Sequence, residues 1–222
     1  MNALLSPALQ DMLIDAGIET AIMVLAAAAI AVLLGLPLAL GLVLTQRAGL
    51  AEAFWINRPL GLLINAVRSV PFIILMVAII PLTRLLAGTA IGTGAAIVPL
   101  SIAATAFIAR LFETALSEVD PGLIEAAQAM GASRWQIVRK VLIPESAPGL
   151  VAAITVTLVS LVGYSAMAGA IGGGGLGDLG IRFGYQRFMP VVMAVVVMLL
   201  IAVVQALQSA GDALVRRLSH RR

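Results

Sequence analysis

The 222-residue chain has no cysteine, a single histidine and few charges, since Asp, Glu, Lys and Arg make up only 11% of it. Without cysteine it can form neither disulfides nor thiolate metal sites. The histidine, His220, stands in a basic tail, where we expect it to be solvated rather than to ligate a metal. No G-x-x-x-x-G-K-[ST] segment occurs, so the chain lacks a P-loop for a nucleotide triphosphate. We therefore expect neither catalytic residues nor a metal site.

Hydrophobic residues make up 61% of the chain, and its mean hydropathy of +1.09 is far above that of a soluble domain. A helix needs about 20 predominantly apolar residues to cross a bilayer. The sequence therefore predicts an all-α integral membrane protein with five transmembrane helices. These spans are expected at about residues 18–44, 59–83, 91–109, 148–171 and 189–207.

The two ends of the chain lie outside these spans. Residues 1–16 contain no Lys or Arg, so we expect an external N-terminal segment and no cleaved secretory leader. Residues 211–222 carry four arginines and are expected to form a basic cytoplasmic tail. Between the two ends, residues 17–210 form the transmembrane domain.

The second span is the least regular of the five. Its uncharged stretch, residues 69–83, is too short to cross a bilayer and must include the residues before it. Arg68 then lies within the helix. An arginine in a membrane is a candidate functional residue, and equally a candidate for a structural ion pair or an interface anchor.

The distribution of charge predicts topology and not a nucleic-acid partner. The net charge is +3, but the cations stand at the ends of hydrophobic runs. With the N-terminus outside, three cations fall in outer segments and ten in inner ones, with Arg68 unassigned. The positive-inside rule therefore favours an external N-terminus and a cytoplasmic C-terminus. The inner cations are Arg47, Arg58, Arg110, Arg134, Arg139, Lys140, Arg216, Arg217, Arg221 and Arg222, and the outer ones are Arg84, Arg182 and Arg187.

The only long polar segment between two hydrophobic runs is residues 118–146. Asp120 followed by proline predicts a capped helix that runs to Met130. The glycine at 131 suits the left-handed residue that ends a helix. We therefore expect this first helix, a glycine break and a second helix, all outside the bilayer.

The second helix of this segment is expected to begin with Ser133 as its cap and to run through Leu142. Pro144 then marks the turn into the next hydrophobic run. Together the two helices would form a knob on the inner side of the membrane.

Glu125, Ala126 and Ala127, then Gly131, resemble the EAA loop of ABC-importer permeases. The pattern of that family is Glu-Ala-Ala, three residues, Gly, nine residues, then Ile-x-Leu-Pro, and here only the Ile and Leu positions differ, as Val and Ile. In such permeases the loop forms coupling helices that dock into a cleft on a cytoplasmic ATPase subunit. The coupling residues implied are Glu125, Ala126, Ala127, Gly131, Arg134, Trp135 and Pro144.

Residues 164–188 and 68–76 resemble the permease subunit of bacterial methionine importers. This resemblance implies a type I ABC-importer fold in the cytoplasmic (inner) membrane of a bacterium. It further implies a homodimer, two ABC ATPase subunits that carry the ATP and Mg, and an extracytoplasmic methionine-binding protein. No cofactor is then expected in this chain.

The fourth span is uncharged and rich in hydroxyl groups that could line a polar path. Tyr164, Ser165 and Met167 are the candidate pathway residues, although Met167 fits better as filler in a helix interface. The glycines that follow, Gly172, Gly173, Gly174 and Gly175, allow sharp turns and close helix approach, and could form a mobile external gate. A G-x-G-x-x-G pattern at residues 175–180 lacks the strand that a dinucleotide site needs.

We therefore expect a permease subunit that forms a pathway for methionine and couples it to a separate ATPase. A permease for another amino acid or small solute is the nearest alternative. An ion-coupled secondary transporter would carry acidic residues within its spans or inverted repeats, and neither is seen. A channel subunit would need no coupling knob.

Overall fold

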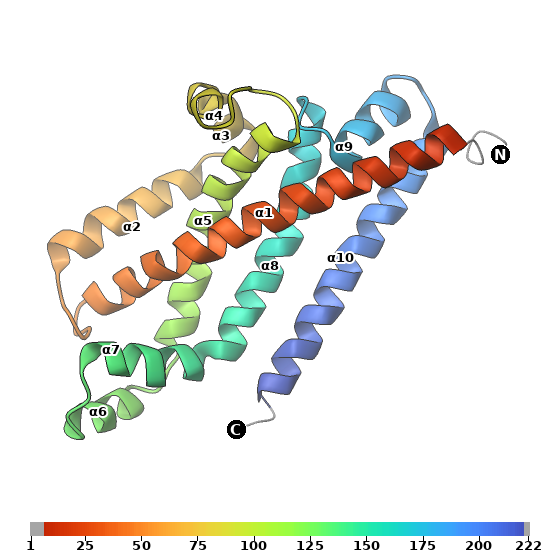
Figure 1. Cartoon of the computed structure of the whole chain (residues 1–222). Coiled ribbons are helices and arrows are strands. Elements are labelled where there is room, and N and C mark those ends of the chain that lie inside the picture. Colours follow the sequence, from red (N-terminus) through yellow and green to blue (C-terminus); the bar gives the residue numbers. More distant parts are fainter. Residues whose placement is uncertain (1–6, 220–222) are drawn as a thin grey trace.

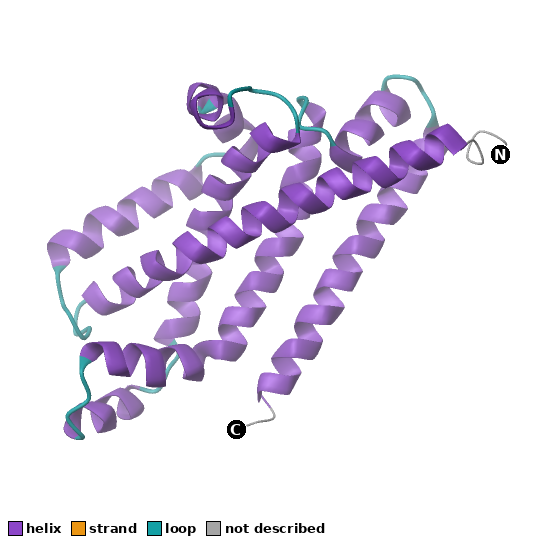
Figure 2. Cartoon of the chain, viewed as in Figure 1, coloured by secondary structure: helices purple, strands orange, loops and turns teal. Residues whose placement is uncertain are grey.

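The computed structural model describes residues 7–219, and His220 lies outside them. All regular structure in this range is helical (Figure 2). The long helices are α1 (Pro7–Thr45), α5 (Thr93–Ser117), α8 (Ile143–Ala170) and α10 (Pro190–Ser219). Shorter ones are α2 (Phe54–Ser69), α3 (Phe72–Ala78), α4 (Ile80–Ala87), α6 (Pro121–Ala129), α7 (Arg134–Ile137) and α9 (Gly175–Leu179), with π turns at Val138–Leu142 and Gly180–Tyr185.

Within residues 7–219, four helices are long and apolar enough to cross a membrane, or five if the bent pair of α2 and α3 counts as one span. This confirms the expected all-helical membrane fold. The first and last of these helices extend well beyond the expected spans. α1 already begins at Pro7, within the expected external segment, and α10 runs on to Ser219, within the expected tail.

The second span is not the continuous helix that was expected over residues 59–83. α2 and α3 meet at an angle of 104°, and α4 follows as a separate short helix. Val70 between α2 and α3 is extended, with φ −87° and ψ 126°, because it precedes Pro71. Pro71 itself can donate no backbone hydrogen bond, so the helix stops and restarts in a new direction.

The core of the bundle is the pair of α1 and α5, which cross and have the most extensive contact of any two helices (Figure 1). Small residues make this approach possible, since Ala27 and Ala31 are fully buried and a Cβ at Gly35 would collide with Ile108. Large side chains of α5, such as Phe112, fill the space around them. Close packing of this kind is what holds helices together in a membrane, where lipid is as apolar as the protein.

The chain places its irregular segments at two opposite ends of the bundle. α6 and α7 lie at the end where α10 finishes, whereas α4 and α9 lie at the other end, with α9 beside the first turns of α1 (Figure 1). The first turn of α1 and the last turn of α10 therefore lie at opposite ends of the bundle, as an odd number of crossings requires. Each end is a separate candidate site.

Candidate functional site

The knob formed by α6 and α7 is held by short-range hydrogen bonds. The carboxylate of Asp120 accepts from the backbone N–H of Gly122 at 2.8 Å, which caps α6. Gly131 has φ +80°, and its left-handed conformation ends the helix. Both features confirm the expectation from the sequence, because each depends on residues close together in the chain.

α7 begins with a reciprocal capping box. The N–H of Gln136 donates to the Ser133 hydroxyl at 3.3 Å, and the N–H of Ser133 donates to the Gln136 side-chain oxygen at 2.7 Å. The predicted cap at Ser133 is thus confirmed. The capping box fixes the direction in which the chain leaves the Gly131 turn.

The expectation that Pro144 turns the chain is wrong. Residues Arg134–Ala170 form one continuous helix, in which Pro144 occupies the first turn of α8. The π turn just before it has Ile143 donating to Val138, five residues back. This wider turn gives the proline ring room that the carbonyl four residues earlier would otherwise take. The knob is therefore rigidly joined to α8 through an unbroken helix.

The knob is anchored by a few buried apolar side chains and exposes others. Ala127, Ile137 and Leu142 are buried against the bundle. By contrast, 81% of Met130 and 68% of Trp135 are exposed. Two exposed large apolar side chains on a mainly polar knob are a candidate surface for another protein. Met130 was not singled out from the sequence, although its place beside a helix-ending glycine was a usable signal.

The polar residues of α6 lie beside the turn that follows α1. Glu125 and Gln128 are exposed, and both line a hollow of ≈ 280 Å³ between α6 and the turn at residues 46–50 of the same chain. Ala126, Gly131 and Arg134 are also exposed on the knob. Of the predicted coupling residues, only Ala127 is buried, and the others are exposed, as Met130 is.

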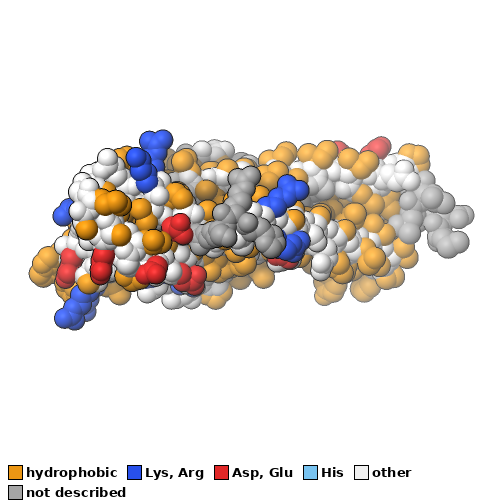
Figure 3. Space-filling model, turned by 90° about the horizontal axis from the view of Figure 1, so that it is seen from below, with side chains coloured by type: hydrophobic (Ala, Val, Ile, Leu, Met, Phe, Trp, Pro, Cys, Tyr) orange, Lys and Arg blue, Asp and Glu red, His pale blue; other side chains and the backbone are white. Residues whose placement is uncertain are grey.

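Viewed from below, this end of the molecule carries side chains of both charges mixed with hydrophobic ones (Figure 3). The flank that leads towards the start of α1 is mostly hydrophobic in the same view. Charge is therefore concentrated where the knob would meet water, which fits a bundle immersed in lipid along its length.

The three candidate pathway residues do not converge on one point within a single chain. Tyr164 is half-buried and stacks on Phe72, with ring centroids 4.8 Å apart. Ser165 is buried and donates to the carbonyl of Val162 in its own helix. Met167 is exposed. Only Met167 thus lies on a surface open to another molecule.

The hydroxyl groups of α8 are largely satisfied by their own helix. Thr155, Thr157 and Ser160 each donate to a carbonyl four residues earlier. Such bonds let polar side chains sit inside a membrane helix at little cost. α8 also presents an uncovered face at helical spacing, which carries Ala152, Val156, Gly163, Met167 and Ala170.

Within the described part of the chain, Arg110, and not Arg68, makes polar contacts between helices. Arg68 is exposed in the last turn of α2, just before the break in the second span. Arg110, expected at the end of a span, lies inside α5, which continues to Ser117. Its guanidinium pairs with Glu113 at 2.6 Å and donates to the carbonyl of Gly61 at 3.0 Å, joining α5 to α2. The spacing of Arg110 and Glu113, one turn apart, was the available signal.

The glycine-rich segment closes the opposite end. Gly172, Gly174 and Gly175 all have positive φ, as the expected sharp turns require. The glycines of the G-x-G-x-x-G pattern belong to α9 and the π turn after it, with no strand before them among the described residues. This arrangement excludes the βαβ unit that dinucleotide binding needs.

Residues 38–220 match the family described as binding-protein-dependent transport system inner membrane component. The chain belongs to this family. It is therefore a multi-pass component of an inner membrane, from a family of permeases.

Relatives within the family match over nearly the whole chain. A protein of Vibrio cholerae, named probable D-methionine transport system permease protein MetI, is 56% identical over 95% of this chain and 94% of its own length. A protein of the same name from Pasteurella multocida is 48% identical over 92% and 94%.

Solved structures give the same family fold. A chain of the MetNI methionine ABC transporter, in an inward-facing conformation, superposes with a TM-score of 0.95 at 46% identity, covering 96% of this chain and 99% of that one. A chain of an amino acid ABC transporter solved with histidines has a TM-score of 0.78 at 21% identity and covers 95% of each, which shows the fold alone.

Proposed function

We propose that this chain is the permease subunit of an ATP-driven importer that carries methionine across the inner membrane. The observation that carries the proposal is the match along the whole chain to permeases named for D-methionine transport and to a methionine ABC transporter. The α6–α7 knob supplies the physical means, because it is rigidly joined to α8 and exposes an apolar tip.

The proposed partners follow from the two surfaces described. Met130 and Trp135 would enter a cleft of an ABC ATPase, with Glu125 and Arg134 contributing polar contacts around them. The ATP and Mg would then be held by that partner. A second copy of this chain would cover the open face of α8, so that the pathway runs between two subunits beside Met167 and Tyr164.

The proposed cycle begins outside, where a methionine-binding protein delivers substrate to the end that carries the glycine-rich segment. Nucleotide binding closes the ATPase pair and moves the knob, and the continuous helix from Arg134 to Ala170 transmits that movement to α8. Alternating access requires that nucleotide binds the two states with different affinity. In the proposed orientation the N-terminus is outside and the C-terminus is in the cytoplasm, and Gly172 to Gly175 are the candidate gate.

Reconstitution in vesicles with the partner ATPase tests this function. We expect methionine uptake that requires ATP and is competed by methionine more strongly than by a panel of other amino acids. Uptake without the ATPase would contradict the proposal. Stronger competition by another amino acid would favour the alternative, a permease for a different solute. The same fold is compatible with that alternative.

A further inference from the structure

Two neighbouring residues of α1 hold the start of α9. The carboxylate of Glu19 accepts from the N–H of Gly175 at 2.6 Å, and the hydroxyl of Thr20 accepts from the N–H of Leu176 at 2.9 Å. Thr20 is only 4% exposed and donates in turn to the carbonyl of Ala16. These contacts join positions that are far apart in the sequence.

The contact supplies acceptors for backbone N–H groups at the start of α9. The first N–H groups of a helix have no acceptor within the helix and need one from elsewhere. α9 follows a run of glycines, which offer no side-chain oxygen. Glu19 and Thr20 therefore cap α9 from another helix, and a bond to a carboxylate is among the stronger hydrogen bonds.

The contact leaves no room for a side chain at three of the glycines in this segment. A Cβ at Gly174 would lie 2.7 Å from the Glu19 carboxylate, and one at Gly175 would lie 2.6 Å from the Thr20 hydroxyl. A Cβ at Gly177 would overlap the backbone of Ala166 in α8. The segment is thus pressed against α1 on one side and α8 on the other.

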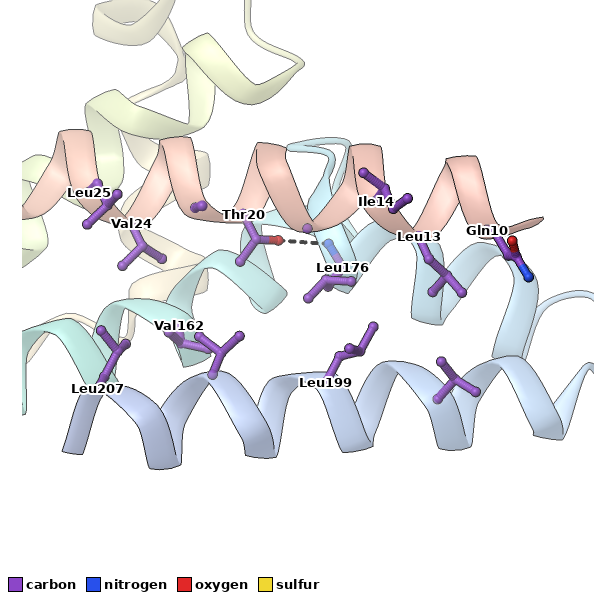
Figure 4. A pocket seen from close by; sticks show the side chains of 14 residues that line it. Gln10, Leu13, Ile14, Thr20, Val24, Leu25, Val162, Leu176, Leu199 and Leu207 are labelled. Atoms are coloured by element: carbon purple, nitrogen blue, oxygen red, sulfur yellow. Dashed lines mark hydrogen bonds between the residues drawn. The ribbon is translucent and has the colours of Figure 1, made fainter. Parts of the chain in front are cut away.

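The same contact lies beside an apolar groove of ≈ 640 Å³ between α1 and α10 (Figure 4). Side chains of α1 and α10 point into this groove, with the bond between Thr20 and Leu176 between them. Thr20 contributes the hydroxyl on a wall that is otherwise almost wholly apolar. The bond between Thr20 and Leu176 is buried, so few alternative acceptors are available to the Leu176 amide.

We propose that Glu19 and Thr20 are positioning residues that clamp the glycine-rich segment to α1, so that the two move as one body during transport. The segment then acts as a fixed end of α1 and not as an independent flap. This inference rests on the proposed transport function. It assigns to α1 a part in opening the outer side of the pathway.

Hydrogen exchange on the purified complex with the partner ATPase tests the clamp itself. We expect Glu19→Ala to raise the exchange of peptides that cover residues 172–179 by at least about tenfold, with Thr20→Val acting in the same region. Thr20→Ser keeps the acceptor and should stay close to wild type. Asp15→Ala, which changes an exposed carboxylate one turn earlier on α1, is the matched control. Unchanged exchange in Glu19→Ala would overturn the proposal.

Transport per ATP hydrolysed tests the role of the clamp. We expect Glu19→Ala to lower methionine imported per ATP by at least about threefold while ATP hydrolysis continues, because a freed segment no longer follows α1. Glu19→Gln keeps an oxygen acceptor and should restore part of the ratio of methionine imported to ATP hydrolysed. This variant also keeps the test available if Glu19→Ala does not fold. A normal ratio in Glu19→Ala, despite raised exchange, would overturn the positioning role.

The two tests separate this proposal from the proposed function. The exchange measurement needs no substrate, so it reports on the clamp even if methionine is not carried. Absence of methionine uptake by the wild-type complex, with the expected exchange pattern, would contradict the substrate assignment and leave the clamp standing.

Discussion

The short helices at the two ends of the bundle are capped in different ways. Each has a short helix next to glycines, outside the long spans. At the knob, Asp120 and Ser133 cap helices that begin within a few residues of them. At the opposite end, α9 is capped by Glu19 and Thr20 from another helix. A locally capped element can expose an apolar tip to a partner, whereas an element capped from afar is bound to the body that caps it.

The largest expected effect comes from breaking the packing of the glycine-rich segment. Gly177→Ala would place a Cβ against the backbone of Ala166 and should cost about 1–3 kcal/mol or more. Loss of monodispersity on heating in detergent should then occur roughly 2–12 °C lower. Gly94→Ala, where the added Cβ meets no neighbouring atom, is the control and should not lower this temperature. Equal behaviour of the two variants would contradict the close packing.

The next effect is at the tip of the knob. Met130→Ala and Trp135→Ala should each weaken binding of the ATPase by about 2 kcal/mol, roughly 30-fold, because an exposed apolar anchor loses its buried area in the complex. The stability of the permease alone should not change, since both side chains are exposed within it. Leu85→Ala, on exposed α4 at the opposite end, serves as the control. Unchanged ATPase affinity in both tip variants would contradict this docking surface.

Gly131→Val should have a smaller cost in stability and a clear effect on coupling. A β-branched residue at φ +80° is strained by about 1–2 kcal/mol, although no neighbouring atom obstructs its Cβ. We expect ATP hydrolysis to continue while import falls, because the angle between α6 and α7 changes. Gly131→Asn tolerates this backbone better and should be milder. Normal import with intact coupling in Gly131→Val would show that the glycine break does not matter.

The comparison also explains how much could be predicted from the sequence. Long apolar runs located the long helices α1, α5, α8 and α10. The capping residues of the knob lie so close to their helices that spacing alone located them. The role of Glu19 could not be found this way, because its partner Gly175 is distant in the chain and donates through its backbone. A backbone donor leaves no mark in the sequence.

Two further differences arose where a proline acted through its neighbours. The expected span over residues 59–83 runs across Pro71, yet the helix breaks there and turns by 104°. Pro144 was treated as a turn, yet the π turn before it let the helix continue. Proline forbids one hydrogen bond in both cases, and the packing of the surrounding helices decides whether the chain bends or absorbs the loss.

The smallest expected effect tests the difference between local and distant caps directly. Asp120→Ala removes the acceptor for Gly122 and should cost about 1 kcal/mol, whereas Asp120→Asn retains a side-chain oxygen and should cost less. Exchange should rise only in the first turn of α6, because α7 has its own capping box. Glu19→Ala, by contrast, should loosen the whole segment at residues 172–179. If Asp120→Ala also loosened α7, the knob would not be built from independently capped helices, and its stiffness would have to come from contact with the bundle.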